Sequence, residues 1–203
     1  MNAYILAGGK SSRMKMDKAF LRLEGKTFLQ RAIECTFGLF RSVYIVGKTY
    51  QDPRIKGCIL DDLEGIGPIG GIYTALRKTD RENNFFIGVD YPLASPEIFL
   101  SLARFLGPGF LGLIPVTPDG PHPLFAFYSR QCLTSIESCI EKGRYDIRCM
   151  ADTSPILFLD LAAHIGTEAF ERLKKNFINI NSARDYHDLL KGMRNRKKFE
   201  KKI

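Results

Sequence analysis

The stretch that decides the fold is residues 4–19, YILAGGKSSRMKMDKA. Its first four residues are a short apolar run, which predicts a buried β-strand. The run ends at Gly8 and Gly9, and glycine lets a backbone take positive φ and approach a ligand closely. Cations follow, among them Lys10, Arg13 and Lys18. Because backbone N–H groups and cations in such a loop can form an anion-binding concavity, the stretch predicts either a triphosphate site or a tight turn with a solvated basic face.

Outward from this stretch, strand patterns and helix patterns alternate through residue 106. Apolar runs predict strands at 43–47, 57–60 and 85–89. Helical periodicity predicts a helix at 28–40, which begins at a capping box of Thr27 and Gln30, and a second helix at 69–78. This alternation predicts a three-layer α/β/α domain with a mostly parallel sheet.

Asp90 follows the apolar run 85–89 directly. In an open α/β sheet, ligands bind at the carboxyl ends of the strands, and this aspartate is predicted to lie there. Mg²⁺ is usually held by one or two carboxylates together with phosphate oxygens. Asp90 is therefore a candidate metal ligand, and the alternative is an aspartate that caps the next loop.

Three glycines, Gly65, Gly67 and Gly70, spell the Gly-x-Gly-x-x-Gly pattern of NAD-binding proteins, with Asp90 twenty positions after Gly70. An NAD-binding oxidoreductase is therefore an alternative. The pattern lies after the third predicted strand instead of the first, and Pro68 lacks an N–H where a pyrophosphate needs donors. Pro68 instead suits the first position of a helix.

The second half changes character. Apolar runs at 111–117 and 123–128 predict two antiparallel strands that extend the sheet, followed by a helix at 129–142 and a strand at 156–161. His122 lies at the exit of the turn between the antiparallel strands. Over 177–182, alternation predicts a strand that places Asn179 and Asn181 on one face. Alternatively, Asn181 and Ser182 cap the last helix, with Asp185 as box partner.

Composition excludes several classes of protein. Residues 191–203 carry six of the eight net positive charges and contain one aromatic residue, Phe199, so we expect a solvated basic tail and no nucleic-acid role. No apolar run approaches the length of a membrane span. The five cysteines are an odd number, are widely spaced and form no Cys-x-x-Cys pair. They therefore argue against a disulfide framework or a zinc knuckle, and they fit the reducing cytoplasm.

The Leu-Ala-Gly-Gly-x-x-x-Arg pattern of residues 6–13, followed by Asp17-Lys18, resembles the molybdenum cofactor guanylyltransferases. These belong to a wider nucleotidyltransferase group with a Rossmann-like fold. Four further segments match in order: Asp61 to Gly71, Asp90-Tyr91-Pro92, His122-Pro123 and Asn179 to Ser182. The chain departs from the pattern at Lys15 and at Gly88-Val89.

The resemblance implies transfer of GMP from GTP to the phosphate of the molybdopterin cofactor, with Mg²⁺ bound at Asp90. It implies Arg13, Lys18 and Asp90 as catalytic residues. The residues that it implies for binding nucleotide, metal or pterin are Leu6, Ala7, Gly8, Gly9, Lys18, Asp61, Asp62, Gly67, Gly70, Asp90, His122, Asn179 and Asn181. It also leads us to expect a cytoplasmic monomer that makes transient contact with molybdoenzymes or their chaperones.

We expect a single nucleotidyltransferase domain at 1–192, with a nucleotide-binding half at 1–106, a pterin-binding half at 107–192 and a basic tail at 193–203. The alternatives at this stage are a transferase that uses CTP or a sugar phosphate, an NAD-binding oxidoreductase, and a non-catalytic nucleotide-binding protein. The sequence does not choose between guanine and cytosine.

Overall fold

The computed structural model of the protein describes residues 1–8, 16–63 and 65–200. In its first strand, β1 (Asn2–Leu6), alternate side chains enter two different apolar clusters. Ala3 and Ile5 join the cluster on one face of the sheet, whereas Tyr4 and Leu6 join the cluster on the other. Because both faces are buried, β1 is apolar from Ala3 onward, as strands at the centre of parallel sheets are.

The main sheet has the order β10-β7-β9-β6-β1-β4-β5, and β8 pairs with β7. A two-stranded hairpin, β2–β3, lies apart from it. Every strand predicted between residues 4 and 161 overlaps an observed one. The remaining bounds are β2 (Arg22–Leu23), β3 (Lys26–Thr27), β4 (Val43–Val46), β5 (Gly57–Ile59), β6 (Asn83–Gly88), β7 (Gly112–Thr117), β8 (Gly120–Pro121), β9 (Phe125–Ser129) and β10 (Ile156–Asp160).

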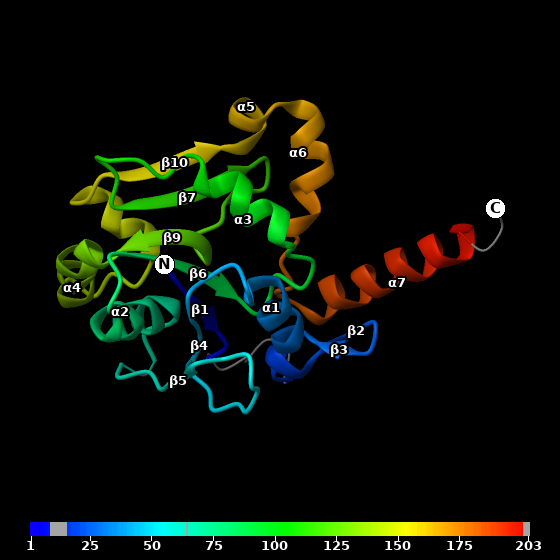
Figure 1. The fold of residues 1–203 in the computed structure, drawn as a ribbon, viewed down its shortest axis with the longest axis horizontal. Helices are drawn as coiled ribbons and strands as arrows, with labels where there is room; N and C mark the ends of the chain where they lie inside the picture. The colour runs from blue at the N-terminus through cyan, green and yellow to red at the C-terminus, as the bar shows by residue number, and fades with distance from the viewer. Residues whose placement is uncertain (9–15, 64, 201–203) are drawn as a thin grey trace.

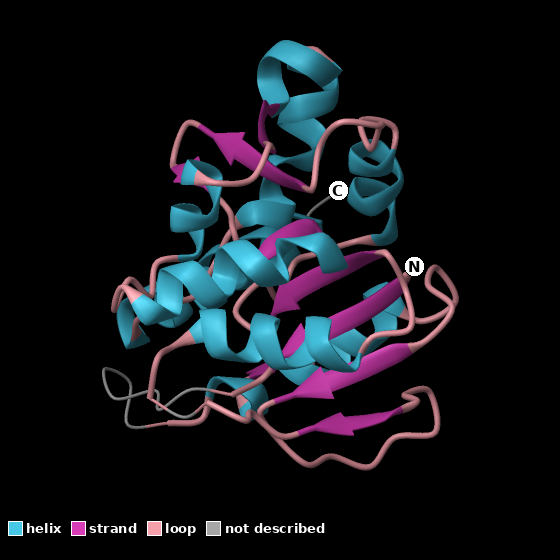
Figure 2. Ribbon diagram, turned by 90° about the vertical axis from the view of Figure 1, so that its left-hand side faces the viewer, coloured by secondary structure: helices cyan, strands magenta, loops and turns pink. Residues whose placement is uncertain are grey.

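Helices cover both faces of the sheet. Residues of α1, α3, α5 and α6 pack on the face of Ala3 and Ile5, and residues of α2 and α4 pack on the opposite face, which is turned toward the viewer in Figure 2. The bounds are α1 (Phe28–Thr36), α2 (Pro68–Lys78), α3 (Pro96–Ala103), α4 (Leu133–Glu141), α5 (Leu161–Ile165), α6 (Thr167–Leu173) and α7 (Ala183–Glu200), with 3₁₀ turns η1 (Lys18–Phe20), η2 (Arg130–Cys132), η3 (Ile147–Asp152) and η4 (Lys174–Phe177). The three-layer α/β/α prediction is confirmed.

The predicted antiparallel extension is present and lies within the main sheet. β9 runs antiparallel to both of its neighbours, β6 and β7, whereas β10 is parallel to β7. The remaining neighbours, β6, β1, β4 and β5, are all parallel. The carboxyl ends of β1, β4 and β6 therefore lie at one edge of the sheet, together with the loop that leads into β9.

The helix predicted at 28–40 is shorter than expected. Its capping box is present, with Gln30 N donating to Thr27 Oγ1 over 3.1 Å, but α1 ends at Thr36. Phe37 already has extended backbone and is exposed. Phe40 does pack on the core, stacking on Phe85 from the loop instead of from the helix. The apolar periodicity thus continued past the point where the backbone leaves the helix.

The strand predicted at 177–182 is wrong, because η4 and irregular chain occupy this segment. The alternative prediction, a helix cap, is confirmed. Asp185 Oδ2 accepts from the backbone N–H of Ser182 over 2.8 Å, and Ser182 Oγ accepts from Asp185 N over 3.2 Å. The orphan N–H groups at the start of α7 satisfy their hydrogen bonds in this way.

The prediction that the cysteines form no disulfide framework needs correction at one pair. The turn at Gly143 brings η3 back against α4, so that the Cα atoms of Cys139 and Cys149 are 6.3 Å apart and their sulfurs are bonded. Cys35, Cys58 and Cys132 are free thiols. Sequence spacing alone did not reveal that the chain folds back here.

The last helix, α7, leaves the body of the molecule, as Figure 1 shows. Its first half packs through Tyr186, Leu189, Leu190 and Met193 on a small third cluster around Phe28. The helix continues through residue 193, so no break in backbone marks the predicted boundary between domain and tail. None of the helices in the described part of the chain is long and apolar enough to cross a membrane.

Candidate active site

The loop after β1 lies against the loop after β4. The backbone N–H groups of Ala7 and Gly8 both donate to Val46 O, over 2.9 and 3.1 Å. A Cβ on Gly8 would lie 2.9 Å from the Cα of Gly47, and a Cβ on Gly47 would lie 2.6 Å from the Cα of Gly8. Only glycine at both positions permits this close approach of the two loops. Gly9 and Arg13, which we predicted to bind phosphate, lie outside the described residues.

Of the two aspartates after β5, Asp61 faces this loop. A Cβ on Gly8 or on Gly47 would lie 3.3 Å from Asp61 Oδ2. Asp62 turns the other way, and its carboxylate accepts from Lys78 of α2 over 3.0 Å. The structure thus brings Asp61 to the predicted site and leaves Asp62 on the surface.

The glycines at the start of α2 are explained by backbone geometry and packing. Gly67 has a φ of +76° and precedes Pro68, which occupies the first turn of α2 as predicted. A Cβ on Gly70 would lie 2.8 Å from Leu63 O. These contacts account for the glycine pattern without a dinucleotide, and the predicted nucleotide contacts of Gly67 and Gly70 stay predictions.

Lys18 and Asp90 meet at the carboxyl edge. Lys18 Nζ lies 3.8 Å from Asp90 Oδ2, and both side chains are largely buried. Burial raises the pKa of Asp90, and the positive charge of Lys18 opposes that increase. Asp90 Oδ1 is buried, and no group among the described residues hydrogen-bonds it. This arrangement leaves one carboxylate oxygen available to a cation.

The segment before α7 completes this site. Lys18 Nζ donates to Asn181 Oδ1 over 3.2 Å, and Asn181 Nδ2 donates to Asn179 Oδ1 over 2.6 Å. The backbone N–H of Ile180 donates to Asp90 O over 2.8 Å. The predicted residues Lys18, Asp90, Asn179 and Asn181 therefore lie together, although up to 163 positions separate them in the chain.

His122 is near these residues but is buried, with 7% of its surface exposed. Its Nε2 lies 2.8 Å from Thr117 Oγ1 and its Nδ1 lies 3.3 Å from the Tyr91 hydroxyl. Burial lowers the pKa of His122 to about 4, so the ring is neutral at pH 7. Both ring nitrogens thus have partners within the protein, and the predicted contact with a pterin stays a prediction.

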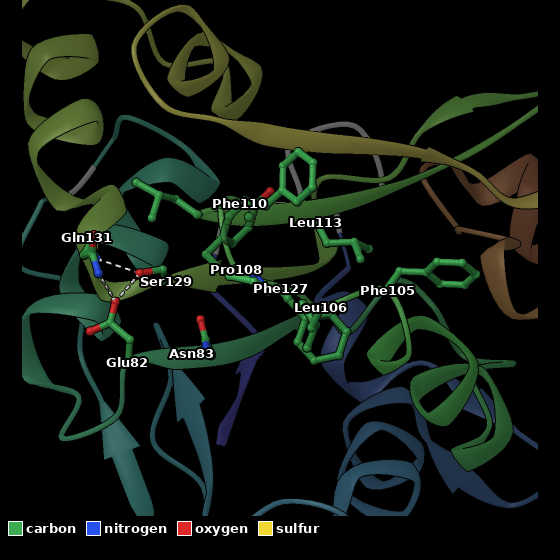
Figure 3. Close-up of a pocket in the computed structure, with 15 residues that line it drawn as sticks. Glu82, Asn83, Phe105, Leu106, Pro108, Phe110, Leu113, Phe127, Ser129 and Gln131 are labelled. Atoms are coloured by element: carbon green, nitrogen blue, oxygen red, sulfur yellow. Dashed lines mark hydrogen bonds between the residues drawn. The ribbon is translucent and has the colours of Figure 1, made fainter. Parts of the chain in front are cut away.

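A cavity of about 580 Å³ lies elsewhere, at the amino end of β6. Figure 3 shows its polar end, where Glu82 accepts from Ser129 Oγ and Gln131 Nε2 over 2.5 and 2.9 Å, and its apolar end around Phe105 and Leu106. It contains none of the predicted site residues. We therefore place the candidate site at the opposite edge of the sheet, where Lys18, Asp90 and Asp61 follow the carboxyl ends of its strands.

Comparison with known proteins agrees with this placement. Residues 3–154, which make up three quarters of the chain, match the sequence model of the MobA-like NTP transferase domain. The chain belongs to the MobA-like NTP transferase family. The match includes Lys18, Asp61, Asp90 and His122, whereas Asn179 and Asn181 lie beyond it.

Relatives of this family extend the similarity to nearly the whole chain. A protein named probable molybdenum cofactor guanylyltransferase from Aquifex aeolicus is 32% identical over 190 residues, which are 92% of this chain and 89% of that protein. A protein of the same name from Pyrococcus furiosus is 32% identical over 193 residues, which are 91% and 94% of the two chains. The resemblance stated from the sequence is confirmed.

Solved structures give the same result. Molybdopterin-guanine dinucleotide biosynthesis protein A from Archaeoglobus fulgidus superposes with a TM-score of 0.74 at 26% identity, covering 91% of this chain and 94% of that chain. A 2-C-methyl-D-erythritol 4-phosphate cytidylyltransferase from Thermus thermophilus superposes with a TM-score of 0.56 at 17% identity, covering 78% and 87%. The second likeness shows the fold alone. The predicted nucleotidyltransferase fold is confirmed, and the oxidoreductase alternative is set aside.

Two groups at this edge were missed by the sequence analysis. Tyr91 was part of the matched Asp90-Tyr91-Pro92 segment but was given no role of its own. Lys48 forms an ion pair with Asp17, the residue that caps η1, and its Nζ lies 4.8 Å from the centre of the Phe20 ring. Burial lowers the pKa of Lys48. Both residues follow the carboxyl end of a parallel strand, and that position was the signal that could have found them.

Proposed function

We propose that this chain transfers GMP from GTP to the phosphate of the molybdopterin cofactor and releases pyrophosphate. One observation carries the proposal: Lys18 lies beside the buried carboxylate of Asp90, just after the end of β6, the strand that pairs with β1. The chain is also 32% identical to proteins named as probable guanylyltransferases for this cofactor.

The reaction needs positioning and charge more than it needs a nucleophilic side chain. An oxygen of the acceptor phosphate forms a bond to the α-phosphorus of GTP, and the bond between that phosphorus and the oxygen bridging to the β-phosphate breaks. Pyrophosphate leaves with the electron pair. Lys18 neutralises charge on the phosphate oxygens, and the backbone from Leu6 to Gly8 lets the triphosphate approach closely. Such electrostatic stabilisation is effective because the donors are already in place.

Asp90 fits a divalent cation, for which we propose Mg²⁺. Its Oδ1 is buried without a hydrogen-bond partner among the described residues, which is the state expected of a carboxylate that awaits a cation. Among all the residues that the structure describes, no group of three or more His, Cys, Asp or Glu side chains could hold a metal ion. Mg²⁺ commonly uses one or two carboxylates plus substrate phosphates, so a single aspartate suffices. When bound, it would neutralise negative charge on the phosphoryl oxygens.

The choice of nucleotide and the surroundings of the enzyme are also proposals. The names of the most similar relatives favour GTP, whereas the likeness to cytidylyltransferases is one of fold. We propose Asp61 as the acidic residue nearest the nucleotide, because it faces Gly8. The predicted monomer, the cytoplasmic location and the transient contact with molybdoenzymes or their chaperones stay predictions.

Release of pyrophosphate tests the function. The wild-type protein is incubated with Mg²⁺, molybdopterin cofactor and either GTP or CTP, and NAD binding is measured in parallel. We expect release that requires GTP, Mg²⁺ and the pterin together. Release with CTP instead would retain the reaction and change its product. Absence of release with both nucleotides would refute the proposal.

One variant and its control test whether Asp90 holds the metal. Asp90→Asn should abolish most of the Mg²⁺-dependent release, because an amide is a weaker ligand for a hard cation. Asp80→Asn is the matched control, since Asp80 precedes β6 at its amino end and accepts from Asn2 Nδ2 over 3.1 Å. An asparagine can still accept that bond, so the control should keep wild-type turnover.

A further inference from the structure

A row of hydrogen-bonded side chains runs from the β7–β8 hairpin to the candidate site. Its members come from four separate parts of the chain. They are Thr117, His122, Tyr91, Asn179, Asn181 and Lys18. The family resemblance suggested direct pterin contacts for three of them, but their observed partners are one another.

The direction of each hydrogen bond follows from Lys18. An ammonium can only donate, so Asn181 must receive it through its carbonyl oxygen and is left with its NH₂ group for Asn179. Asn179 in turn accepts through its carbonyl oxygen and has its NH₂ group for the Tyr91 hydroxyl, to which it is hydrogen-bonded. The orientation of both amides is thereby fixed.

The row continues in the same sense at the buried end. The Tyr91 hydroxyl, with its oxygen occupied by Asn179, donates to His122 Nδ1 over 3.3 Å. A neutral imidazole has one acceptor and one donor, so His122 Nε2 carries the proton and donates to Thr117 Oγ1 over 2.8 Å. Every member thus donates to the next, and hydrogen bonds aligned head to tail strengthen one another.

The two ends of the row differ in burial. Tyr91 and His122 are 4% and 7% exposed, and their rings pack on Phe125 and Phe177 with centroids 5.3 and 4.9 Å apart. Asn181, at the other end, is exposed. A lysine side chain gives up about 2 kcal/mol of rotamer entropy when it is held in one place. A rigid anchor in the core can hold Lys18 through the two asparagines before a substrate arrives.

We propose that Tyr91 and His122 are positioning residues that act through Asn179 and Asn181 to hold Lys18 beside Asp90. The inference rests on the proposed function, because Lys18 matters through the phosphate charge that it neutralises. The same segment also reaches Asp90, whose carbonyl oxygen accepts from Ile180 N. Residues 179–181 thus hold Lys18 through Asn181 and the Asp90 carbonyl oxygen through Ile180.

Tyr91→Phe tests the proposal with little change in shape. It keeps the ring that packs on Phe125 and removes the hydroxyl at the middle of the row. We expect kcat with GTP to fall about tenfold, which corresponds to 1.4 kcal/mol, while the KM for the molybdopterin cofactor stays unchanged. Tyr128→Phe is the matched control, because Tyr128 is also buried and its hydroxyl donates to Pro123 O over 2.8 Å, away from Lys18.

A double variant separates positioning from general stability. If Tyr91 acts through Lys18, then Tyr91→Phe costs nothing more in a Lys18→Ala background. A purely structural role would multiply the two losses. Asn179→Ala, at a half-buried position, gives a second break in the row that does not disturb the core, and it should also lower kcat about tenfold.

Each outcome bears on one claim. A wild-type protein without GTP- or CTP-dependent pyrophosphate release overturns the proposed function. An active wild type with equally active Tyr91→Phe and Asn179→Ala variants overturns the positioning role alone. A rise in the KM for the molybdopterin cofactor with unchanged kcat would assign these residues to the acceptor and would also overturn it.

Discussion

Gly88 is the glycine whose replacement should disturb the Asp90 carboxylate most directly. A Cβ at this position would lie 2.3 Å from Asp90 Oδ1, whereas ordinary contacts begin at 3.4 Å. The backbone cannot easily yield, because Gly88 N donates to Leu124 O over 2.8 Å and Val89 N donates to Leu6 O over 3.1 Å. The carboxylate of Asp90 must therefore move by about 1 Å. Since a displacement of that size can cost about 100-fold in rate, we expect Gly88→Ala to lower kcat by about this factor.

The assay is pyrophosphate release with GTP and the molybdopterin cofactor over a range of Mg²⁺ concentrations. Gly88→Ala should need more Mg²⁺ as well as turn over more slowly, while its thermal unfolding midpoint changes little. Gly57→Ala is the control, because a Cβ on this strand glycine would meet nothing within 4 Å. If Gly88→Ala kept wild-type turnover at the wild-type Mg²⁺ requirement, the reasoning about the Asp90 carboxylate would be wrong.

Three further predictions follow from the same structure. Lys18→Ala should lower kcat about 100-fold and change the free energy of unfolding by only about 1 kcal/mol, as measured by turnover and urea titration, and wild-type turnover would contradict the phosphate assignment. Burial lowers the pKa of His122 from 6.5 to about 4, although the charge of Asp119 opposes this shift. At a pH between these two values, His122 therefore takes up a proton when the protein unfolds. The protein should therefore lose up to about 3 kcal/mol of stability between pH 6.5 and pH 4, and urea titrations of His122→Gln should lack that part of the loss. Deletion of residues 194–203 should shift the thermal midpoint by less than about 3 °C, because Met193 is the last described side chain of α7 in the third cluster, and a larger shift would place the tail within the domain.

The sheet could be predicted from the sequence because its central strands are buried on both faces. Residues 85–89 read as a continuous apolar run, and Phe85, Phe86 and Ile87 are fully buried in β6. Helix ends were harder. Phe37 and Phe40 continued the apolar period of α1, and only the backbone of Phe37 shows that the helix has ended.

The site could be predicted in part, since glycines and charges after parallel strands are a local signal. Lys18 and Asp90 were found in this way, whereas the Asn179–Asn181 segment was found through the family resemblance, and all of them lie together. The partner of Tyr91 could not be found, because nothing in the sequence says that His122 returns to it across the sheet. The Cys139–Cys149 bond was missed for the same reason, because it depends on how a turn brings two segments together.

The contact between Lys18 and Asn181 also has a consequence for biosynthesis. Lys18 and Asp90 leave the ribosome early, and β1, β4 and β6 can pair while the second half is still being made. The groups that hold the lysine and the Asp90 carbonyl come from Asn181 and Ile180, among the last to be translated. A nascent chain that stops before residue 180 would therefore carry the central strands of the sheet without a fixed lysine. Completion of translation, and not formation of those strands, would set the moment at which the protein first holds nucleotide.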